Sequence, residues 1–278
     1  GPQFHEALAY IAEGHLGRPV MARAWESAQQ GSIGHPPDSA PPAGVDYDMW
    51  LGPAPQREFN PRRFHSSWRW FFDYGTGDLG NDGVHRIDVA VWALETALQA
   101  AGEEPLSRLP RTVHAVGGKL YFDDDQQWPD TLMVNYDFGR AIVNYEMRLW
   151  NPYPLFRHGE GAAVYGDQGY IIIANREWQA FGPKDEPRAK GRGDHDDAGH
   201  ARNFIDCMRS REKPAADLET VGHRSSMLCH LGNAAWRAGR SLEFDPESFS
   251  FVGDAEADRF LARESYRPPW RLPTLAEL

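Results

Sequence analysis

The sequence predicts an α+β fold, built on one large, predominantly antiparallel open sheet with helices on one face. In the second half of the chain, apolar and polar residues alternate in consecutive segments joined by short turns, which is typical of an antiparallel meander. Helical periodicity flanks this meander, and no series of alternating strands and helices precedes it. A chain of 278 residues can bury a core without disulfides, and we expect a single domain over residues 1–278.

The first expected elements are a helix and a strand. Apolar residues follow Pro2 at helical spacing, and Gly14 is a typical residue for the end of that helix. Weak alternation predicts a strand over residues 19–28. A long excursion rich in glycine, proline and aromatic residues follows, over about 29–80. We expect it to be ordered, because so much aromatic area either folds over a core or lines a site.

A helix is predicted directly after Asn81. Val84, Ile87 and Val91 fall at helical intervals, and asparagine is a favoured residue at a helix N-cap. We therefore expect Asn81 either to cap this helix or to contact a substrate.

The meander and the last helices follow. The predicted strands run over residues 112–122, 131–137, 141–149, 162–166, 169–174 and 177–182. A polar, glycine-rich break over 183–199 comes next, and helices are predicted over 200–211, 218–239 and 254–264.

The charge balance limits the classes of partner. The chain has 29 Lys and Arg against 40 Asp and Glu, a net charge of −11, which argues against nucleic acid or an anionic membrane surface as the main partner. The sequence contains no long apolar run typical of a spanning helix, and its N-terminus lacks the pattern of a signal peptide. We therefore expect a cytoplasmic protein. Its 2 cysteines are too few for a disulfide framework or a cysteine-based zinc site.

Common motifs for nucleotide and ester chemistry are missing from their usual contexts. No G-x-G-x-x-G run opens a turn from a predicted strand into a helix, so the sequence shows no dinucleotide-binding unit. A P-loop and a G-x-S-x-G nucleophile elbow are also absent from the sequence.

Several longer motifs do point to one family. They are Tyr47-Asp48-Met49-Trp50-Leu51-Gly52-Pro53, Trp68-Arg69-Trp70-Phe71, Gly80-Asn81-Asp82-Gly83-Val84-His85-Arg86-Ile87-Asp88, His200-Ala201-Arg202-Asn203-Phe204 and Tyr266-Arg267-Pro268-Pro269-Trp270. With these motifs the chain resembles the carboxy-terminal half of the glucose-fructose oxidoreductase/inositol dehydrogenase/MocA (Gfo/Idh/MocA) oxidoreductases, in their bacterial form, from Phe4 to Pro273.

The resemblance implies a substrate-binding and oligomerising domain. Members of the family place a Rossmann domain and an active-site lysine before this region, and neither is found in this sequence. By resemblance the cofactor is NAD(P), the substrate is a sugar or a cyclitol, and the chain forms a homo-oligomer through the open face of its sheet.

The resemblance also assigns residue roles. It makes His85 the acid/base histidine, with Asp88 one helical turn further on. An imidazole that titrates near neutrality suits the removal of a hydroxyl proton from a carbinol. Many relatives have an aspartate four residues before this histidine, where this chain has Asn81. An amide binds a hydroxyl but exchanges no proton, so His85 acts alone or with Asp82 or Asp88.

Other residues are weaker candidates for the site. Trp68, Trp70 and Tyr74 either stack on a sugar ring or cover the sheet or an oligomer contact. The resemblance implies that His200 and Asn203 face the substrate. His195, Asp197 and His200 have the ligand types of a Zn, Mn or Fe site, although such clusters in polar loops are more often solvated surface.

Three functional hypotheses follow. The first is the substrate-binding and oligomerising half of an NAD(P)-dependent sugar or cyclitol oxidoreductase, which is not redox-competent alone. The second is a free-standing enzyme that performs cofactor-independent or metal-assisted acid/base chemistry on a keto-sugar, as a lyase, hydratase or epimerase does. The third is a non-catalytic carbohydrate-binding or scaffold module.

Overall fold

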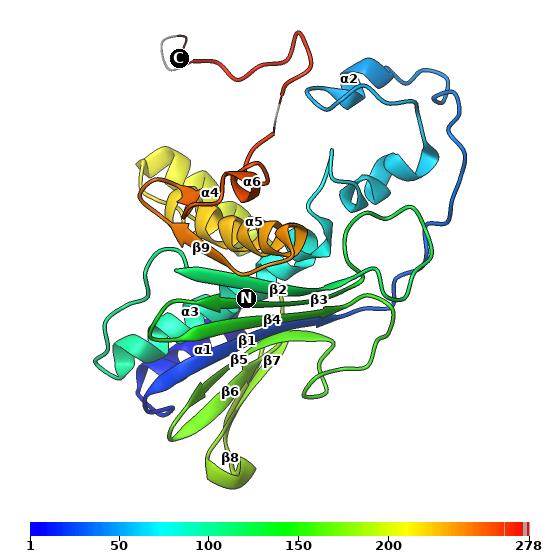
Figure 1. The fold of residues 1–278 in the computed structure, drawn as a ribbon. Helices are drawn as coiled ribbons and strands as arrows, with labels where there is room; N and C mark the ends of the chain where they lie inside the picture. The colour runs from blue at the N-terminus through cyan, green and yellow to red at the C-terminus, as the bar shows by residue number, and fades with distance from the viewer. Residues whose placement is uncertain (264, 275–276, 278) are drawn as a thin grey trace.

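The computed structural model describes residues 1–263, 265–274 and 277, and it contains one ten-stranded sheet (Figure 1). The strand order is β10-β9-β2-β3-β4-β1-β5-β6-β7-β8. The strands are β1 (Pro19–Ser27), β2 (Thr112–Gly118), β3 (Thr131–Asp137), β4 (Ile142–Arg148), β5 (Glu160–Gly166), β6 (Gly169–Ile173), β7 (Glu177–Phe181), β8 (Pro187–Arg192), β9 (Leu242–Asp245) and β10 (Ser250–Phe251). The predicted fold, one large and mostly antiparallel sheet with helices, is confirmed.

The pairing of β1 makes the sheet mixed. β1 runs parallel to β4, with Ala24 opposite Tyr145, and antiparallel to β5, with Glu26 opposite Glu160. The other pairings between the named strands are antiparallel. The first strand of the chain therefore lies in the middle of the sheet, between two segments that follow it much later in the sequence.

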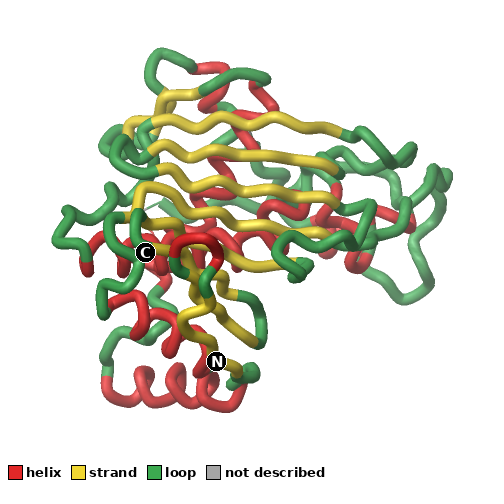
Figure 2. The backbone as a smooth tube through the Cα atoms, turned by 90° about the horizontal axis from the view of Figure 1, so that it is seen from below, coloured by secondary structure: helices red, strands yellow, loops and turns green. Residues whose placement is uncertain are grey.

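Helices cover one face of this sheet. The α-helices are α1 (Pro2–Ala12), α2 (Tyr47–Leu51), α3 (Val84–Ala100), α4 (Asp197–Ser210), α5 (His223–Ala238) and α6 (Ala255–Asp258). α3 lies against β1 and β5, α5 against β2 and β3, and α1 against α3 and the β7–β8 end. From below, the strands stand in front of the helices (Figure 2). None of the helices in the described part of the chain combines the length and hydropathy that crossing a bilayer requires.

The two faces differ in burial. The main core lies between the sheet and the helices, and it contains Ala22 and Ala24 of β1 and Tyr145 of β4. A second, smaller cluster on the other face surrounds Trp25 and Ala163. Because side chains alternate along a strand, β1 supplies residues to both clusters.

The long excursion is ordered. It carries α2 and the 3₁₀ helices Pro61–Arg63 and His65–Trp70, and bridges at Ser39–Phe59 and Gln29–Trp150 join it to itself and to the sheet.

Several elements differ from the sequence prediction. β8 lies within the break expected over 183–199, and β9 and β10 were not expected. β8 is largely exposed, so it has no apolar alternation that would reveal it. Asn81 is not a cap: a π-helical turn, Leu79–Gly83, comes first, the N-cap of α3 is Gly83, and no side-chain hydrogen bond closes it. A similar π turn, Leu218–Gly222, precedes α5.

The packing of α5 on the sheet makes a testable prediction. A Cβ on Gly232 would lie 2.7 Å from the Tyr136 hydroxyl oxygen and 2.9 Å from Leu79 Cδ2, whereas a Cβ on Gly222 would meet nothing closer than 3.6 Å. We expect Gly232→Ala to lower the free energy of unfolding by about 1–3 kcal/mol, because it overpacks the core. Gly222→Ala, the matched control, should raise it by about 0.5–1 kcal/mol through helix propensity. Urea denaturation measures the free energy of unfolding of both variants. Equal changes in the two variants would contradict the close packing of Gly232 against Tyr136 and Leu79.

Candidate functional site

The first turn of α3 brings together the residues assigned to acid/base chemistry. His85 is exposed, and the half-buried Asp88 carboxylate accepts a hydrogen bond of 2.5 Å from the Ser225 hydroxyl on α5. Burial raises the pKa of Asp88, and the Ser225 hydrogen bond and the nearby His85 oppose this effect. Asp88 thus fixes α3 to α5, while the imidazole of His85 stays accessible to a ligand.

Arg86 holds the other side of the same turn. It forms an ion pair with Glu160 of β5 and donates a hydrogen bond of 2.7 Å to Asn175 Oδ1. The backbone carbonyl of Asn175 in turn accepts a hydrogen bond from Gln3 of α1. These contacts tie the start of α3 to the loop after β6.

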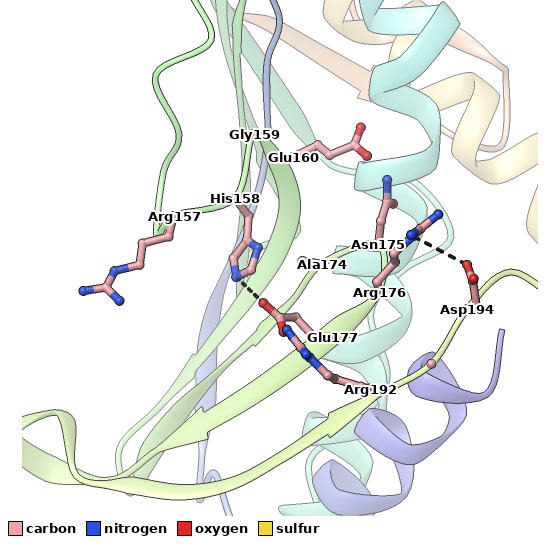
Figure 3. A pocket seen from close by; sticks show the side chains of 11 residues that line it. Arg157, His158, Gly159, Glu160, Ala174, Asn175, Arg176, Glu177, Arg192 and Asp194 are labelled. Atoms are coloured by element: carbon pink, nitrogen blue, oxygen red, sulfur yellow. Dashed lines mark hydrogen bonds and ion pairs between the residues drawn. The ribbon is translucent and has the colours of Figure 1, made fainter.

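A charged pocket begins at this ion pair (Figure 3). Its volume is about 820 Å³, within the range of small-molecule sites. It is lined by Arg157, His158, Gly159, Glu160, Ala174, Asn175, Arg176, Glu177, Arg192, Gly193 and Asp194. Glu177 pairs with Arg192 at 2.9 Å and with His158 at 3.7 Å, and Glu160 reaches toward α3. The polar lining suits a ligand with many hydroxyl groups.

Three carboxylates converge beneath the π turn. Glu26 of β1 is 6% exposed, Asp78 is 1% exposed, and Asp82 is half-buried. Their oxygens lie within 4.8 Å of one another. Glu26 shares its face of β1 with Ala22 and Ala24, the face that packs against the helices, so strand alternation directs this acid into the core. We call Glu26, Asp78 and Asp82 the carboxylate cluster.

Tyr145 lies under the same turn. It is completely buried, and its hydroxyl oxygen has no hydrogen-bond partner. A Cβ on Gly83 would stand 2.7 Å from this oxygen. Glycine at position 83 therefore allows the π turn to rest on the phenol.

The environment changes the acidity of the cluster. Burial, reinforced by the negative charges of Asp78 and Asp82, raises the pKa of Glu26 to about 9. Burial and the charge of Asp82 raise the pKa of Asp78 to about 7. Both carboxyl groups therefore bind protons at a pH where an exposed acid is ionised.

The segment before the π turn matches the G-x-G-x-x-G spacing at Gly75, Gly77 and Gly80, but its setting is different. It follows a 3₁₀ helix and not a strand. A Cβ on Gly77 would meet Trp128, whose indole nitrogen donates to the Gly75 carbonyl oxygen. The close approach of Trp128 therefore explains why glycine occupies this segment. Asp78 lies inside the run, and its carboxylate would oppose a phosphate, so these residues do not fit a dinucleotide.

The other predicted residues separate into groups. Asn81 donates a hydrogen bond of 2.7 Å to Asp82 and stays near the cluster. Trp68 and Tyr74 line a different cavity of about 300 Å³, and Trp70 is buried in the core.

His200 and Asn203 lie on α4. His200 is exposed, while Asn203 accepts a hydrogen bond of 2.9 Å from the Ala215 backbone. Among the described residues, the side chains whose ligand atoms lie close enough together to hold one metal ion are those of the carboxylate cluster. His195, Asp197 and His200 do not form such a group.

Sequence reasoning missed Glu26, Asp78 and Tyr145. A signal existed for Glu26, because a glutamate on the apolar face of the predicted strand 19–28 breaks the alternation. The approach of Asp78 and Tyr145 to this residue depends on the order of strands in the sheet, which no local pattern contains.

The raised pKa values predict how stability changes with pH. Between about pH 4 and pH 9 the folded chain binds more protons at Glu26 and Asp78 than the unfolded chain, so its stability falls as pH rises. In metal-free buffer, we expect Glu26→Gln to reduce this fall by about 1.4 kcal/mol per pH unit. The exposed control Glu104→Gln should behave as the wild type. Urea denaturation from pH 5 to pH 9 measures this, and equal slopes for all three proteins would contradict the burial of an acidic Glu26.

Comparisons with known proteins identify the family. A family model described as "Oxidoreductase family, C-terminal alpha/beta domain", of the Gfo/Idh/MocA group, matches residues 16–106 and 187–272. No curated protein matches the chain.

Solved structures share the fold. The aldose-aldose oxidoreductase from Caulobacter crescentus, complexed with glycerol, has a TM-score of 0.55 and 16% identity, with 87% of this chain and 60% of that chain covered. The WlbA dehydrogenase from Bordetella pertussis, in complex with NADH and UDP-GlcNAcA, has a TM-score of 0.52 and 14% identity, with 87% and 59% covered. An oxidoreductase from Thermotoga maritima has a TM-score of 0.54 and 15% identity, with 87% of this chain and 59% of that chain covered.

The described chain thus spans about three fifths of the length of these solved relatives. Its fold and the match over most of its length agree with the motifs around His85. The chain belongs to the Gfo/Idh/MocA oxidoreductase family and carries the C-terminal alpha/beta domain of that family.

Proposed function

We propose that the chain is the substrate-binding and oligomerising half of an NAD(P)-dependent oxidoreductase that acts on a sugar or a cyclitol. The observation that carries this proposal is the first turn of α3, which presents an exposed His85 and, at the next residue, Arg86, whose ion pair with Glu160 reaches the lining of a charged pocket of about 820 Å³. The relatives whose structures hold glycerol, or NADH with UDP-GlcNAcA, support the substrate class and the cofactor.

The chemistry of this chain is proton transfer and positioning. His85 takes the proton of a substrate hydroxyl, because a neutral imidazole accepts a proton near neutral pH. Asp88, fixed by Ser225, holds the turn that carries the imidazole. The charged side chains of the pocket orient further hydroxyl groups through hydrogen bonds. The dinucleotide belongs to another part of the enzyme, since the glycine run of this chain does not fit it.

The exposed apolar surface of α4 is a candidate contact for a neighbouring domain. No residue of this helix is buried, and Phe204, Ile205 and Met208 are exposed by 57%, 43% and 54%. Apolar residues gathered on one exposed helix are typical of a contact surface. Because the solved relatives are longer than this chain, we propose that the cofactor domain covers this helix.

Ligand binding tests the site. We expect the chain to bind at least one aldose or cyclitol in calorimetric titrations, and to bind neither NADH nor NADPH. His85→Ala should weaken polyol binding about threefold to tenfold, since it removes one hydrogen bond. His114→Ala, an exposed histidine on β2, should leave binding unchanged. Tight NAD(P)H binding by this chain, or equal affinities for the two variants, would contradict the proposal.

A second function has one observation in its favour. The carboxylate cluster lies one turn from His85, which would suit cofactor-independent acid/base chemistry on a keto-sugar. Exchange of the proton next to the ketone in D₂O, followed by NMR and lost in His85→Ala but not in His114→Ala, would favour this function. Absence of exchange in a chain that binds polyols would favour the first.

The face of the sheet opposite the helices is proposed as the oligomer contact. Val116, Met133 and Ile142 are exposed by 57%, 46% and 45% on this face, and Val116 pairs directly with Met133. Such an apolar surface on an open sheet favours self-association.

Light scattering tests this contact. We expect the wild-type chain to be a homo-oligomer and Met133→Lys to dissociate it, because a charge in the contact loses its hydration. Met49→Lys changes another exposed methionine, 61%, which lies on α2 and not in the sheet, and it should leave the mass unchanged. A monomeric wild type would argue against the contact.

A further inference from the structure

The carboxylate cluster has the geometry of a cation site. One acid comes from the middle of the sheet and two come from the segment that ends in the π turn, so the fold brings distant parts of the chain together. Two oxygens that bind one ion at about 2.4 Å lie at most about 4.8 Å apart. The oxygens of Glu26, Asp78 and Asp82 meet this condition, each with every other.

Buried oxygens in and beside the cluster lack partners. Glu26 Oε2 and Asp78 Oδ2 are buried and accept no hydrogen bond. The Tyr145 hydroxyl, on a fully buried side chain beneath Gly83, is also without a partner. Buried polar atoms in folded proteins almost always have a partner, and an unfilled set commonly marks a bound ion or water. Tyr145 belongs to the sheet and not to an acidic segment, so it points to a ligand independently of the carboxylates.

The arginines whose charges reach the cluster are bonded elsewhere. Arg86 pairs with Glu160 and donates to Asn175. Arg69 donates a hydrogen bond to the Ser66 carbonyl oxygen, and its Cζ lies over the Trp70 ring, 4.6 Å from the ring centroid. Neither guanidinium forms a hydrogen bond with Glu26 or Asp78. A small cation that displaces the protons of these two acids would balance the charges of the three carboxylates and fill the open oxygens.

We propose that Glu26, Asp78 and Asp82 bind one divalent cation, with the Tyr145 hydroxyl beside it. The donors are all oxygen atoms, which suits Ca²⁺, Mn²⁺ or Mg²⁺, whereas Zn²⁺ and Cu²⁺ favour nitrogen or sulfur ligands. The ion enters from the side of Asp82, the half-buried member. It joins β1 to the π turn and so holds the start of α3, from which His85 projects. This site is independent of the proposed oxidoreductase function, because its test measures binding and not turnover.

Manganese is a direct probe of this site. The chain is freed of metal with EDTA and dialysed, MnCl₂ is added stepwise, and the EPR signal of free Mn²⁺ gives the bound fraction. We expect one saturable site per chain. Glu26→Gln and Asp82→Asn should each weaken binding at least tenfold, since each removes a ligand. Glu104→Gln, an exposed acid, should bind as the wild type does.

A second measurement protects the test from a folding defect. Asp82 is only half-buried, so Asp82→Asn should fold, and circular dichroism checks this before titration. CaCl₂ and MgCl₂ should compete for the manganese site and raise the midpoint of thermal unfolding of the wild type but not of folded Asp82→Asn. No saturable Mn²⁺ binding by the wild type, or equal binding by Asp82→Asn and Glu104→Gln, would overturn the proposal.

Discussion

Strand β1 lies between β4 and β5 in the middle of the sheet, and the carboxylate cluster, Tyr145 and the Arg86–Glu160 ion pair depend on this pairing. The parallel register with β4 sets Glu26 two residues beyond Ala24, the neighbour of Tyr145, on the same face. The antiparallel register with β5 sets Glu26 beside Glu160, which binds Arg86. A register shift of one residue would turn Glu26 to the other face and leave α3 without its anchor.

The start of α3 combines two opposite electrostatic requirements. On its lower side, acids are buried so deeply that they hold protons near neutral pH. On its outer side, His85 is exposed and free to meet a ligand. The π turn separates the two environments: it contains Asp82 of the carboxylate cluster, while the α-helix that follows it carries the exposed His85. Such turns occur often at functional sites, and here the turn lets one short segment supply both environments.

The sequence could predict most strands, since half-buried strands show their alternation directly. β3 runs over the residues that its pattern predicts, 131–137. β8 escaped prediction because most of its side chains face solvent, so it carries no apolar period. The start of α3 was placed wrongly at Asn81, since local preferences for N-caps contain no information on a preceding π turn. The residues around His85 could be found by resemblance, whereas Glu26 and Tyr145 become neighbours of Asp78 only through the order of the strands.

The edges of the sheet have a further consequence. β8 forms one edge, and it carries Pro187, Arg188, Lys190 and Arg192, while β10 at the other edge has only 2 residues. Proline and positive charge on an edge strand prevent pairing with another chain, and so does a very short strand. The sheet therefore offers no template for growth by added strands. If the proposed contact forms, copies of this chain meet face to face, while the edges of the sheet protect them from joining edge to edge into fibres.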